Sequence, residues 1–152
     1  NVASPGRCEV IHRDPTIILD AAHNPHGAAA IAETVQSEFT FDEVIGVVAP
    51  MGDKDIHGIL LELEQVMDSI IVTANSSSRS TPVDKLEKIA IEVFGESRVR
   101  TASTPYRAVE LARELVSENG AIVVTGSITL VGDVLKNIQL GSDENEGETY
   151  EN

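Results

Sequence analysis

The feature that most constrains the fold of this chain is a regular alternation between two hydrophobic periods. Apolar runs of about five residues, typical of buried strands, alternate with stretches of roughly 10–15 residues in which apolar positions recur every three or four residues, as on one face of a helix. The expected strands lie at Cys8–Arg13, Thr16–Asp20, Val44–Ala49, Ser69–Ala74, Arg98–Ala102 and Ala121–Thr125. The helical patterns lie at Ala28–Phe39, Ile56–Met67, Leu86–Val93, Ala108–Leu115 and Thr129–Ile138. Helices that join successive strands make right-handed crossovers, so the sequence predicts an α/β fold with a mostly parallel sheet of about six strands and helices on both faces.

The first two expected strands depart from this pattern, because only Asp14-Pro15 separates them. A connection this short joins antiparallel strands, so one antiparallel strand is expected at the N-terminal edge of the sheet. Three helix starts are marked by a polar N-cap residue followed by proline at the first helical position. They are Asn24-Pro25, Thr81-Pro82 and Thr104-Pro105.

Charge and cysteine content narrow the class of protein. The chain has 152 residues and a net charge of −14, which argues against nucleic acid or an anionic membrane as a partner, since both require a positive surface. The apolar runs are too short to span a bilayer. A single cysteine, Cys8, cannot form an internal disulfide, which fits a reducing compartment, and the cytoplasm is the expected location.

The acidic residues are concentrated at the C-terminus. Residues 142–152 carry five of the 25 acidic side chains and no basic one, so they are expected to be a disordered acidic tail. Residues 1–141, with the remaining 20 acids against 11 bases and a net charge of −9, are expected to form the folded domain. The chain starts without methionine on a loop-like segment, and we interpret it as a domain cut from a longer protein.

The predicted topology indicates where a ligand would bind. Open α/β sheets bind ligands beyond the carboxyl ends of their strands, where helix N-termini offer N–H groups. We call this the carboxyl edge of the sheet. It is expected to be formed by the loops Asp20–Asn24, Pro50–Asp55, Asn75–Thr81, Ser103–Thr104 and Gly126–Ser127.

The first of these loops is the densest in polar groups. Asp20, His23 and Asn24 bring a carboxylate, an imidazole and an amide to one helix N-terminus. Carboxylates at strand ends often bind ribose hydroxyls, and the helix N-terminus favours phosphate. The alternative is that Asp20 and Asn24 only satisfy backbone N–H groups of the turn and the helix cap. Two histidines, His23 and His26, make a weak case for zinc, so no metal site is expected.

Two further loops carry candidate groups. Lys54 is the only lysine before Lys85, and it is expected at a helix start, which is unfavourable for a cation unless an anion lies close by. That anion is either a neighbouring aspartate or a group of a substrate. In Thr125-Gly126-Ser127, the glycine lets the backbone approach a ligand and the serine supplies a hydroxyl, although this pattern alone is more often a helix cap.

Four blocks of sequence together resemble a known family. They are Gly6-Arg7-Cys8-Glu9-Val10-Ile11, Ile18-Leu19-Asp20-Ala21-Ala22-His23-Asn24-Pro25, Gly52-Asp53-Lys54-Asp55 and Val124-Thr125-Gly126-Ser127. Their order and spacing resemble the C-terminal domain of the folylpolyglutamate synthases, including the bifunctional dihydrofolate synthases, in the Mur ligase superfamily. The resemblance covers about residues 5–140, and the Asp-Ala-Ala-His-Asn-Pro block is its most specific part.

The resemblance implies a Rossmann-like domain of an ATP-dependent ligase that joins L-glutamate to a folate carboxylate through an acyl phosphate. It implies ATP and magnesium as cofactors, with the magnesium ligands mainly in an N-terminal P-loop ATPase domain. That domain, L-glutamate and folate are the implied partners. The implied roles are nucleotide binding by Arg7, Asp20 and Asn24, glutamate binding by Lys54 and Ser127, and a catalytic position for His23 between nucleotide and glutamate.

Two features depart from this family. The chain has no P-loop motif, so it is expected to be inactive alone. Its third loop reads Ser78-Arg79-Ser80-Thr81-Pro82, where relatives more often have Pro-Arg-Ala, so Arg79 is left out of the predicted site. The alternatives are the C-terminal domain of a peptidoglycan Mur ligase and a non-catalytic nucleotide-binding or interaction module.

Overall fold

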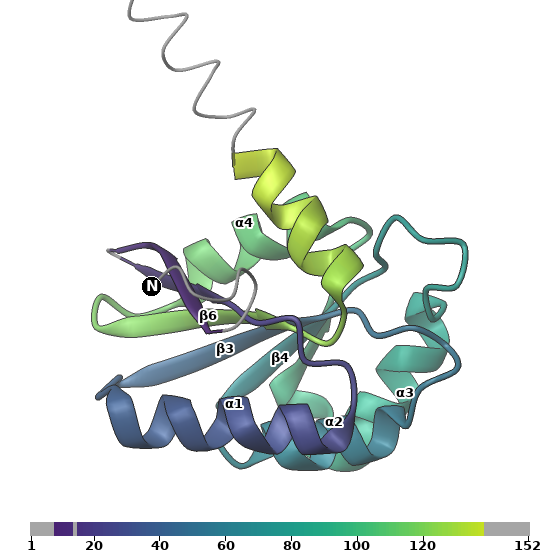
Figure 1. The fold of residues 1–152 in the computed structure, drawn as a ribbon, viewed down its shortest axis with the longest axis horizontal. Helices are drawn as coiled ribbons and strands as arrows, with labels where there is room; N and C mark the ends of the chain where they lie inside the picture. The colour runs from purple at the N-terminus through teal and green to yellow at the C-terminus, as the bar shows by residue number, and fades with distance from the viewer. Residues whose placement is uncertain (1–7, 14, 139–152) are drawn as a thin grey trace, which may run out of the picture.

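The structure, a computed structural model, describes residues 8–13 and 15–138. In this part of the chain, one six-stranded sheet lies between two layers of helices (Figure 1). Arg7, the predicted end of the domain at residue 141 and the predicted acidic tail at 142–152 lie outside the described residues. None of the helices described is long and apolar enough to cross a membrane.

The sheet has the strand order β1-β2-β6-β3-β4-β5. Its strands are β1 (Glu9–His12), β2 (Thr16–Leu19), β3 (Glu43–Val48), β4 (Ser69–Val72), β5 (Val99–Thr101) and β6 (Gly120–Thr125). β1 pairs antiparallel with β2, and all other neighbours pair in parallel. The predicted fold class and the antiparallel edge strand are confirmed. Because β6 lies between β2 and β3, the loops that follow these three strands are neighbours at the carboxyl edge.

Helices cover both faces of the sheet. They are α1 (Pro25–Glu38), α2 (Ile56–Glu64), α3 (Val83–Phe94), α4 (Pro105–Leu115), a short 3-10 helix η1 (Glu96–Arg98) and a C-terminal helix over residues 128–138. In the view of Figure 1, α1, α2 and α3 lie below the sheet, and α4 and the C-terminal helix lie above it. Each layer buries its own apolar cluster, and alternate residues of the strands contribute to the two clusters. Burial on both faces explains why the central strands are continuous runs of valine and isoleucine.

The structure corrects three predicted apolar helix positions. Met67 lies beyond the end of α2, and its side chain fills the space that Gly46 of β3 leaves open, since a Cβ on Gly46 would overlap the Met67 sulfur. Phe39 is the extended residue that follows α1. Leu115 is 37% exposed at the end of α4, whereas Val109 is buried, so the buried face of α4 is rotated from the predicted one.

Two of the three predicted helix caps are confirmed. Asn24 Oδ1 accepts a hydrogen bond from Gly27 N at 2.8 Å, and Thr104 Oγ1 accepts one from Arg107 N at 3.2 Å. In both helices proline occupies the first turn, as predicted. The two caps fix where α1 and α4 begin and therefore the shape of the loops before them.

The predicted cap at Thr81 is wrong. α3 begins one residue later than expected, with Pro82 at the N-cap position and no side-chain cap. Thr81 is completely buried, and its hydroxyl donates to the Pro50 carbonyl at 2.8 Å. The hydroxyl is thus used to join two loops of the carboxyl edge instead of capping the helix.

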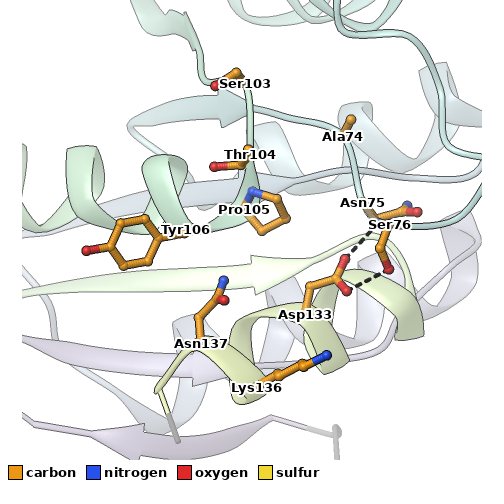
Figure 2. A pocket seen from close by; sticks show the side chains of 10 residues that line it. All are labelled: Ala74, Asn75, Ser76, Ser103, Thr104, Pro105, Tyr106, Asp133, Lys136 and Asn137. Carbon is orange, nitrogen blue, oxygen red and sulfur yellow. Dashed lines mark hydrogen bonds between the residues drawn. The ribbon is translucent and has the colours of Figure 1, made fainter. Parts of the chain in front are cut away.

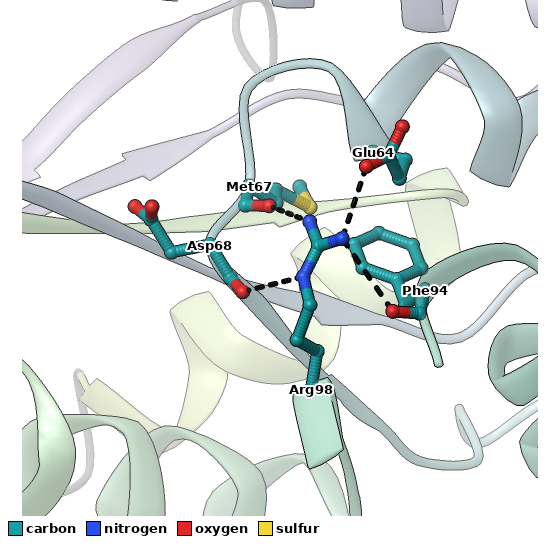
Figure 3. A network of polar contacts seen from close by, with 5 residues as sticks. All are labelled: Glu64, Met67, Asp68, Phe94 and Arg98. Carbon is teal, nitrogen blue, oxygen red and sulfur yellow. Dashed lines mark hydrogen bonds and ion pairs between the residues drawn. The ribbon is translucent and has the colours of Figure 1, made fainter. Parts of the chain in front are cut away.

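At the amino-terminal ends of β4 and β5, on the side of the sheet away from the carboxyl edge, Arg98 joins the ends of two helices (Figure 3). Its Nε donates to Asp68 O at 2.9 Å, and its Nη2 donates to Met67 O at 2.8 Å. Its Nη1 bonds Glu64 Oε2 at 3.0 Å and Phe94 O at 3.4 Å, and the guanidinium carbon lies 5.0 Å from the centre of the Phe94 ring. One side chain therefore satisfies carbonyl groups that follow α2 and end α3.

Candidate functional site

Hydrogen bonds tie the loop after β2 to the end of β6. Asp20 N donates to Val124 O at 3.0 Å, and Gly126 N donates to Ala22 O at 3.0 Å. The loop that carries Asp20, His23 and Asn24 is thereby fixed beside the loop that carries Ser127. The predicted neighbourhood of these loops at the carboxyl edge is confirmed.

Asp20 is 8% exposed, and its carboxylate orders the loop around it. Oδ1 accepts from Cys8 N at 2.9 Å, and Oδ2 accepts from Ala22 N at 3.0 Å. The alternative weighed from the sequence, that Asp20 satisfies backbone groups, is therefore part of its role. The same bonds connect the segment that precedes β1 to the carboxyl edge, next to the position of Arg7 in the sequence. Nucleotide binding by Asp20 stays a prediction.

His23 and Asn24 line a cavity together with Asp20. This cavity has a volume of about 700 Å³, and the 72% exposed side chain of Ile128 also lines it. Nδ1 of His23 lies 3.3 Å from Ala21 O, in an exposed position. Asn24 is exposed and uses its side-chain oxygen in the cap of α1. Three of the predicted site residues are thus in one cavity.

Cys8 lines the same cavity but is poorly suited to act as a nucleophile. Partial burial raises the pKa of its thiol, and the negative charges of Asp20 and Glu38 raise this pKa further. The thiol is therefore protonated at neutral pH. The backbone of Cys8 has a φ of +46°, which a residue with a side chain rarely adopts, and the bond from its N–H to Asp20 holds this conformation.

Lys54 has no ion pair with its neighbouring aspartates. Asp53 instead bonds Arg79, with its Oδ2 2.6 Å from Nη2, and this bond holds the pKa of the Asp53 carboxyl below its usual value. Asp55 caps α2 by accepting from Gly58 N at 3.0 Å. In the part of the chain that the structure describes, no salt bridge reaches the ammonium of Lys54. Lys54 therefore makes no direct salt bridge among these residues, although its charge also contributes, less than Arg79, to the lowered pKa of Asp53.

Ser127 is 2% exposed, and its hydroxyl caps the C-terminal helix. Oγ accepts from Leu130 N at 3.0 Å and donates to Ala49 O at 3.1 Å. Asn75 Nδ2 lies 3.3 Å from the same oxygen. Direct contact between this hydroxyl and glutamate requires one of these partners to be exchanged, and glutamate binding by Ser127 stays a prediction.

Gly126 takes a conformation that only glycine adopts readily. Its φ is +113°, and a Cβ at this position would lie 3.0 Å from Val48 Cγ1 and 3.5 Å from Ala49 N. This backbone directs the chain from β6 into the C-terminal helix while allowing the loop after β3 to approach closely.

We expect Gly126→Ala to lower the free energy of unfolding by about 1–3 kcal/mol, because alanine is strained at this φ and crowds Val48. Urea unfolding of the chain measures this change. Gly132→Ala is the matched control: it lies inside the C-terminal helix with open space around its Cβ, so it should be neutral or stabilise by up to about 1 kcal/mol. A Gly126→Ala variant with wild-type stability would show that the backbone here is not constrained.

The sequence analysis did not select Asn75, which the structure places among three loops of the edge. Its side chain is buried, and Nδ2 donates to Ala49 O at 2.7 Å. Next to it, Ser76 bonds Asp133 of the C-terminal helix through both its N–H and its hydroxyl, at 2.8 and 2.7 Å (Figure 2). These residues line a second cavity, of about 520 Å³, with Tyr106 and Lys136. The signal in the sequence was the position of Asn75 close after a strand, at the carboxyl edge.

The groups around the larger cavity fit a nucleoside better than a metal ion. A carboxylate, an imidazole and the apolar side chain of Ile128 are groups suited to bind a ribose and a base. Within residues 8–13 and 15–138, no group of three or more histidine, cysteine, aspartate or glutamate side chains could hold a metal ion.

An open α/β sheet with polar loops and helix N-termini at one edge defines a ligand-binding domain of the doubly wound class. Residues 6–128 match the family model described as Mur ligase, glutamate ligase domain. The dihydrofolate synthase/folylpolyglutamate synthase of Mycobacterium tuberculosis is 44% identical over 144 residues, which cover 86% of this chain and 30% of that protein.

Solved structures agree with this match. The structure of Mycobacterium tuberculosis folylpolyglutamate synthase complexed with ADP has a TM-score of 0.86 and 43% identity, covering 89% of this chain and 32% of that one. A bifunctional folylpolyglutamate synthase/dihydrofolate synthase with Mn, AMPPNP and L-glutamate bound has a TM-score of 0.81 and 26% identity, covering 90% and 32%. The chain belongs to the Mur ligase, glutamate ligase domain family, which confirms the resemblance to folylpolyglutamate synthases. It spans about a third of the length of these relatives.

Proposed function

We propose that this chain is the C-terminal domain of an ATP-dependent ligase that adds L-glutamate to a folate. The observation that carries the proposal is the match to the glutamate ligase domain family together with Lys54, a cation at the carboxyl edge without an ion pair to the described residues. A carboxylate of glutamate can form the direct ion pair that this lysine does not make with Asp53. The relatives named as folylpolyglutamate synthases favour a folate over a peptidoglycan precursor as the acceptor.

The proposed reaction has two steps. Phosphorylation of the folate carboxylate by ATP gives an acyl phosphate and ADP. The glutamate amine then attacks the acyl carbon, the bond from that carbon to the phosphate oxygen breaks, and inorganic phosphate leaves with the electron pair while the amine nitrogen releases a proton. The contribution of this domain is to hold the amine close to the acyl carbon, which removes most of the entropic cost of a reaction between separate molecules.

The residues of the carboxyl edge divide between the two substrates in this proposal. Asp20 and Asn24, which line the larger cavity, bind the nucleotide. Arg7, which precedes β1 in the sequence, is also assigned to the nucleotide. Lys54 binds a carboxylate of glutamate, and Ser127 binds glutamate once one of the three partners of its hydroxyl is exchanged. These two groups of loops are hydrogen-bonded to each other through Ala22 and Gly126, so nucleotide and glutamate are held in a fixed relation.

His23 is the catalytic candidate of the proposed site. It is exposed, lines the same cavity as Asp20 and lies in the loop bonded to Gly126. This position allows its imidazole to reach a group between the two substrates, either to accept a proton from the amine or to bind phosphate oxygens.

The remaining parts of the reaction belong to other residues of a longer protein. Magnesium neutralises the phosphate charge when bound, and we propose that its ligands lie mainly in an N-terminal P-loop ATPase domain. The folate binds largely to that domain as well. We further propose a cytoplasmic location, in line with the single cysteine.

Asp20→Asn in the full-length protein is expected to raise the KM for ATP on the order of tenfold. Both carboxylate oxygens accept from backbone N–H groups, so the amide replaces one acceptor by an NH2 donor and also removes the charge that would bind ribose hydroxyls. The KM for glutamate should change by less than about threefold. Steady-state kinetics with each substrate varied in turn provide the measurement. Asp84→Asn, at the exposed first turn of α3, is the control and should leave both constants unchanged. An unchanged KM for ATP would rule out the nucleotide role of Asp20.

The experiment that tests the proposed function is incorporation of labelled L-glutamate into a reduced folate in the presence of ATP and magnesium. The full-length protein should form the glutamylated product, and this 152-residue chain alone should form none. Product formation by the chain alone would overturn the two-domain proposal. Glutamate transfer to a muramyl precursor in place of folate would instead favour a peptidoglycan ligase.

A further inference from the structure

The loop after β4 lies against the loop after β3, which carries Lys54. Met51 and Ser80 form an antiparallel bridge, and Gly52 N donates to Arg79 O at 2.8 Å. At the far end, Arg79 holds Asp53, the residue before Lys54. The loop after β4, residues 75–81, therefore supports the Lys54 loop along its length.

Asn75 is the first residue of the loop after β4, and its side chain is buried. Its Nδ2 donates to Ala49 O at 2.7 Å, where the Lys54 loop leaves β3, and lies 3.3 Å from Ser127 Oγ. Its Oδ1 accepts from Ser77 N at 2.9 Å, which closes its own loop. A single amide side chain thus joins the three loops that follow β3, β4 and β6.

Asn75 is one of the three hydrogen-bond partners that fix the orientation of the Ser127 hydroxyl. A hydroxyl has one proton and two lone pairs, and in Ser127 the proton is directed to Ala49 O while the lone pairs face Leu130 N and Asn75 Nδ2. Asn75 supplies the donor that fills the last of these positions. Ala49 O in turn accepts hydrogen bonds from both Ser127 and Asn75. The loops of Lys54 and Ser127 are therefore held together at this one carbonyl, which is their fixed point.

We propose that Asn75 is a positioning residue for glutamate: it sets the relative position of Lys54 and Ser127 without contacting the substrate. This role rests on the proposed function, because it takes Lys54 and Ser127 as the glutamate-binding residues. Asp20 and His23 lie on the loop after β2, to which no hydrogen bond of Asn75 extends among the described residues. Loss of the Asn75 amide should therefore raise the KM for glutamate and leave the KM for ATP nearly unchanged.

The test is Asn75→Asp in the full-length protein. Aspartate has nearly the same shape and keeps the acceptor for Ser77 N, but it replaces the donor to Ala49 and Ser127 by an oxygen. We expect the KM for glutamate to rise about tenfold, as for the loss of one or two hydrogen bonds, and the KM for ATP to stay within about twofold. Ser76→Ala is the control in the same loop: it removes the hydroxyl bond to Asp133 only and should leave both constants within about twofold.

Two further variants keep the test decisive. If Asn75→Asp does not fold, Asn75→Ala, which places no charge against Ala49 O, should show the same selective rise. Combining Asn75→Asp with Ser127→Ala should raise the KM for glutamate no further than the larger single change, because both act through the same fixed point.

The outcomes separate this inference from the proposed function. No glutamate-dependent phosphate release by the wild-type protein would refute the proposed function, and the role of Asn75 with it. An active Asn75 variant with an unchanged KM for glutamate would overturn the role of Asn75 alone. An equal rise in both KM values would also overturn it, since that result indicates a general structural role.

Discussion

Lys54→Ala in the full-length protein is expected to raise the KM for L-glutamate by about 10–100-fold, the effect of losing a hydrogen bond between an ammonium and a carboxylate. The KM for ATP should change by less than about threefold, because Lys54 is absent from the lining of the larger cavity. The reason for a large effect is that no salt bridge to another described residue reaches Lys54: Asp53 is bound by Arg79 and Asp55 caps α2. The ammonium can therefore pair with a substrate, and the neighbouring cation, Arg79, is already bonded to Asp53.

Two controls make the Lys54 measurement specific. Lys85→Ala removes an exposed lysine of α3 and should change neither constant. Lys54→Arg keeps the charge with a different geometry and should lie between wild type and Lys54→Ala. If glutamate saturation is the same for Lys54→Ala and wild type, this lysine does not bind the amino acid.

Arg98→Ala is expected to lower the free energy of unfolding of the chain by about 2–4 kcal/mol, equivalent to a fall in Tm of roughly 5–12 °C. The arginine donates to the carbonyls of Met67, Asp68 and Phe94, and it pairs with Glu64 (Figure 3). Truncation leaves these carbonyls, at the ends of two helices, without their donor. It also removes the contact with the Phe94 ring.

The control for Arg98→Ala is the same substitution at an arginine that does not make these contacts. Arg107 is 72% exposed, and its pair with Glu110 is 3.8 Å long, so Arg107→Ala should change the stability by at most about 0.5 kcal/mol. Arg98→Lys should lower the free energy of unfolding nearly as much as Arg98→Ala does, because a lysine cannot donate to carbonyls in several directions through a planar group. Equal melting temperatures for Arg98→Ala and Arg107→Ala would contradict the role assigned to Arg98.

The fold was predictable from the sequence because its signals are local. Buried strands and amphipathic helices repeat within short windows, and the two-residue connection between the first strands determines the antiparallel edge. Asn24 and Thr104 cap their helices as expected. Thr81 has the same local pattern, yet it is buried against Pro50, so tertiary contact overrides the local preference for capping.

The candidate site was predictable only in part. Asp20, His23 and Asn24 lie close together in the sequence, on one loop, and in the structure they line one cavity. Asn75 was missed because its partners Ala49 and Ser127 are 26 and 52 residues away in the sequence, and no local pattern reports such a contact. The pairing of Asp53 with Arg79, which leaves Lys54 without an aspartate partner among the described residues, depends on the same packing of two loops.

A crystal structure of the full-length protein with L-glutamate and a non-hydrolysable ATP analogue tests the central proposal most directly. We predict a glutamate carboxylate within hydrogen-bond distance of Lys54 Nζ and the nucleotide ribose within reach of Asp20. Glutamate bound away from the Lys54 loop, for example in the cavity lined by Tyr106 and Lys136, would contradict the proposed division of the carboxyl edge between nucleotide and amino acid.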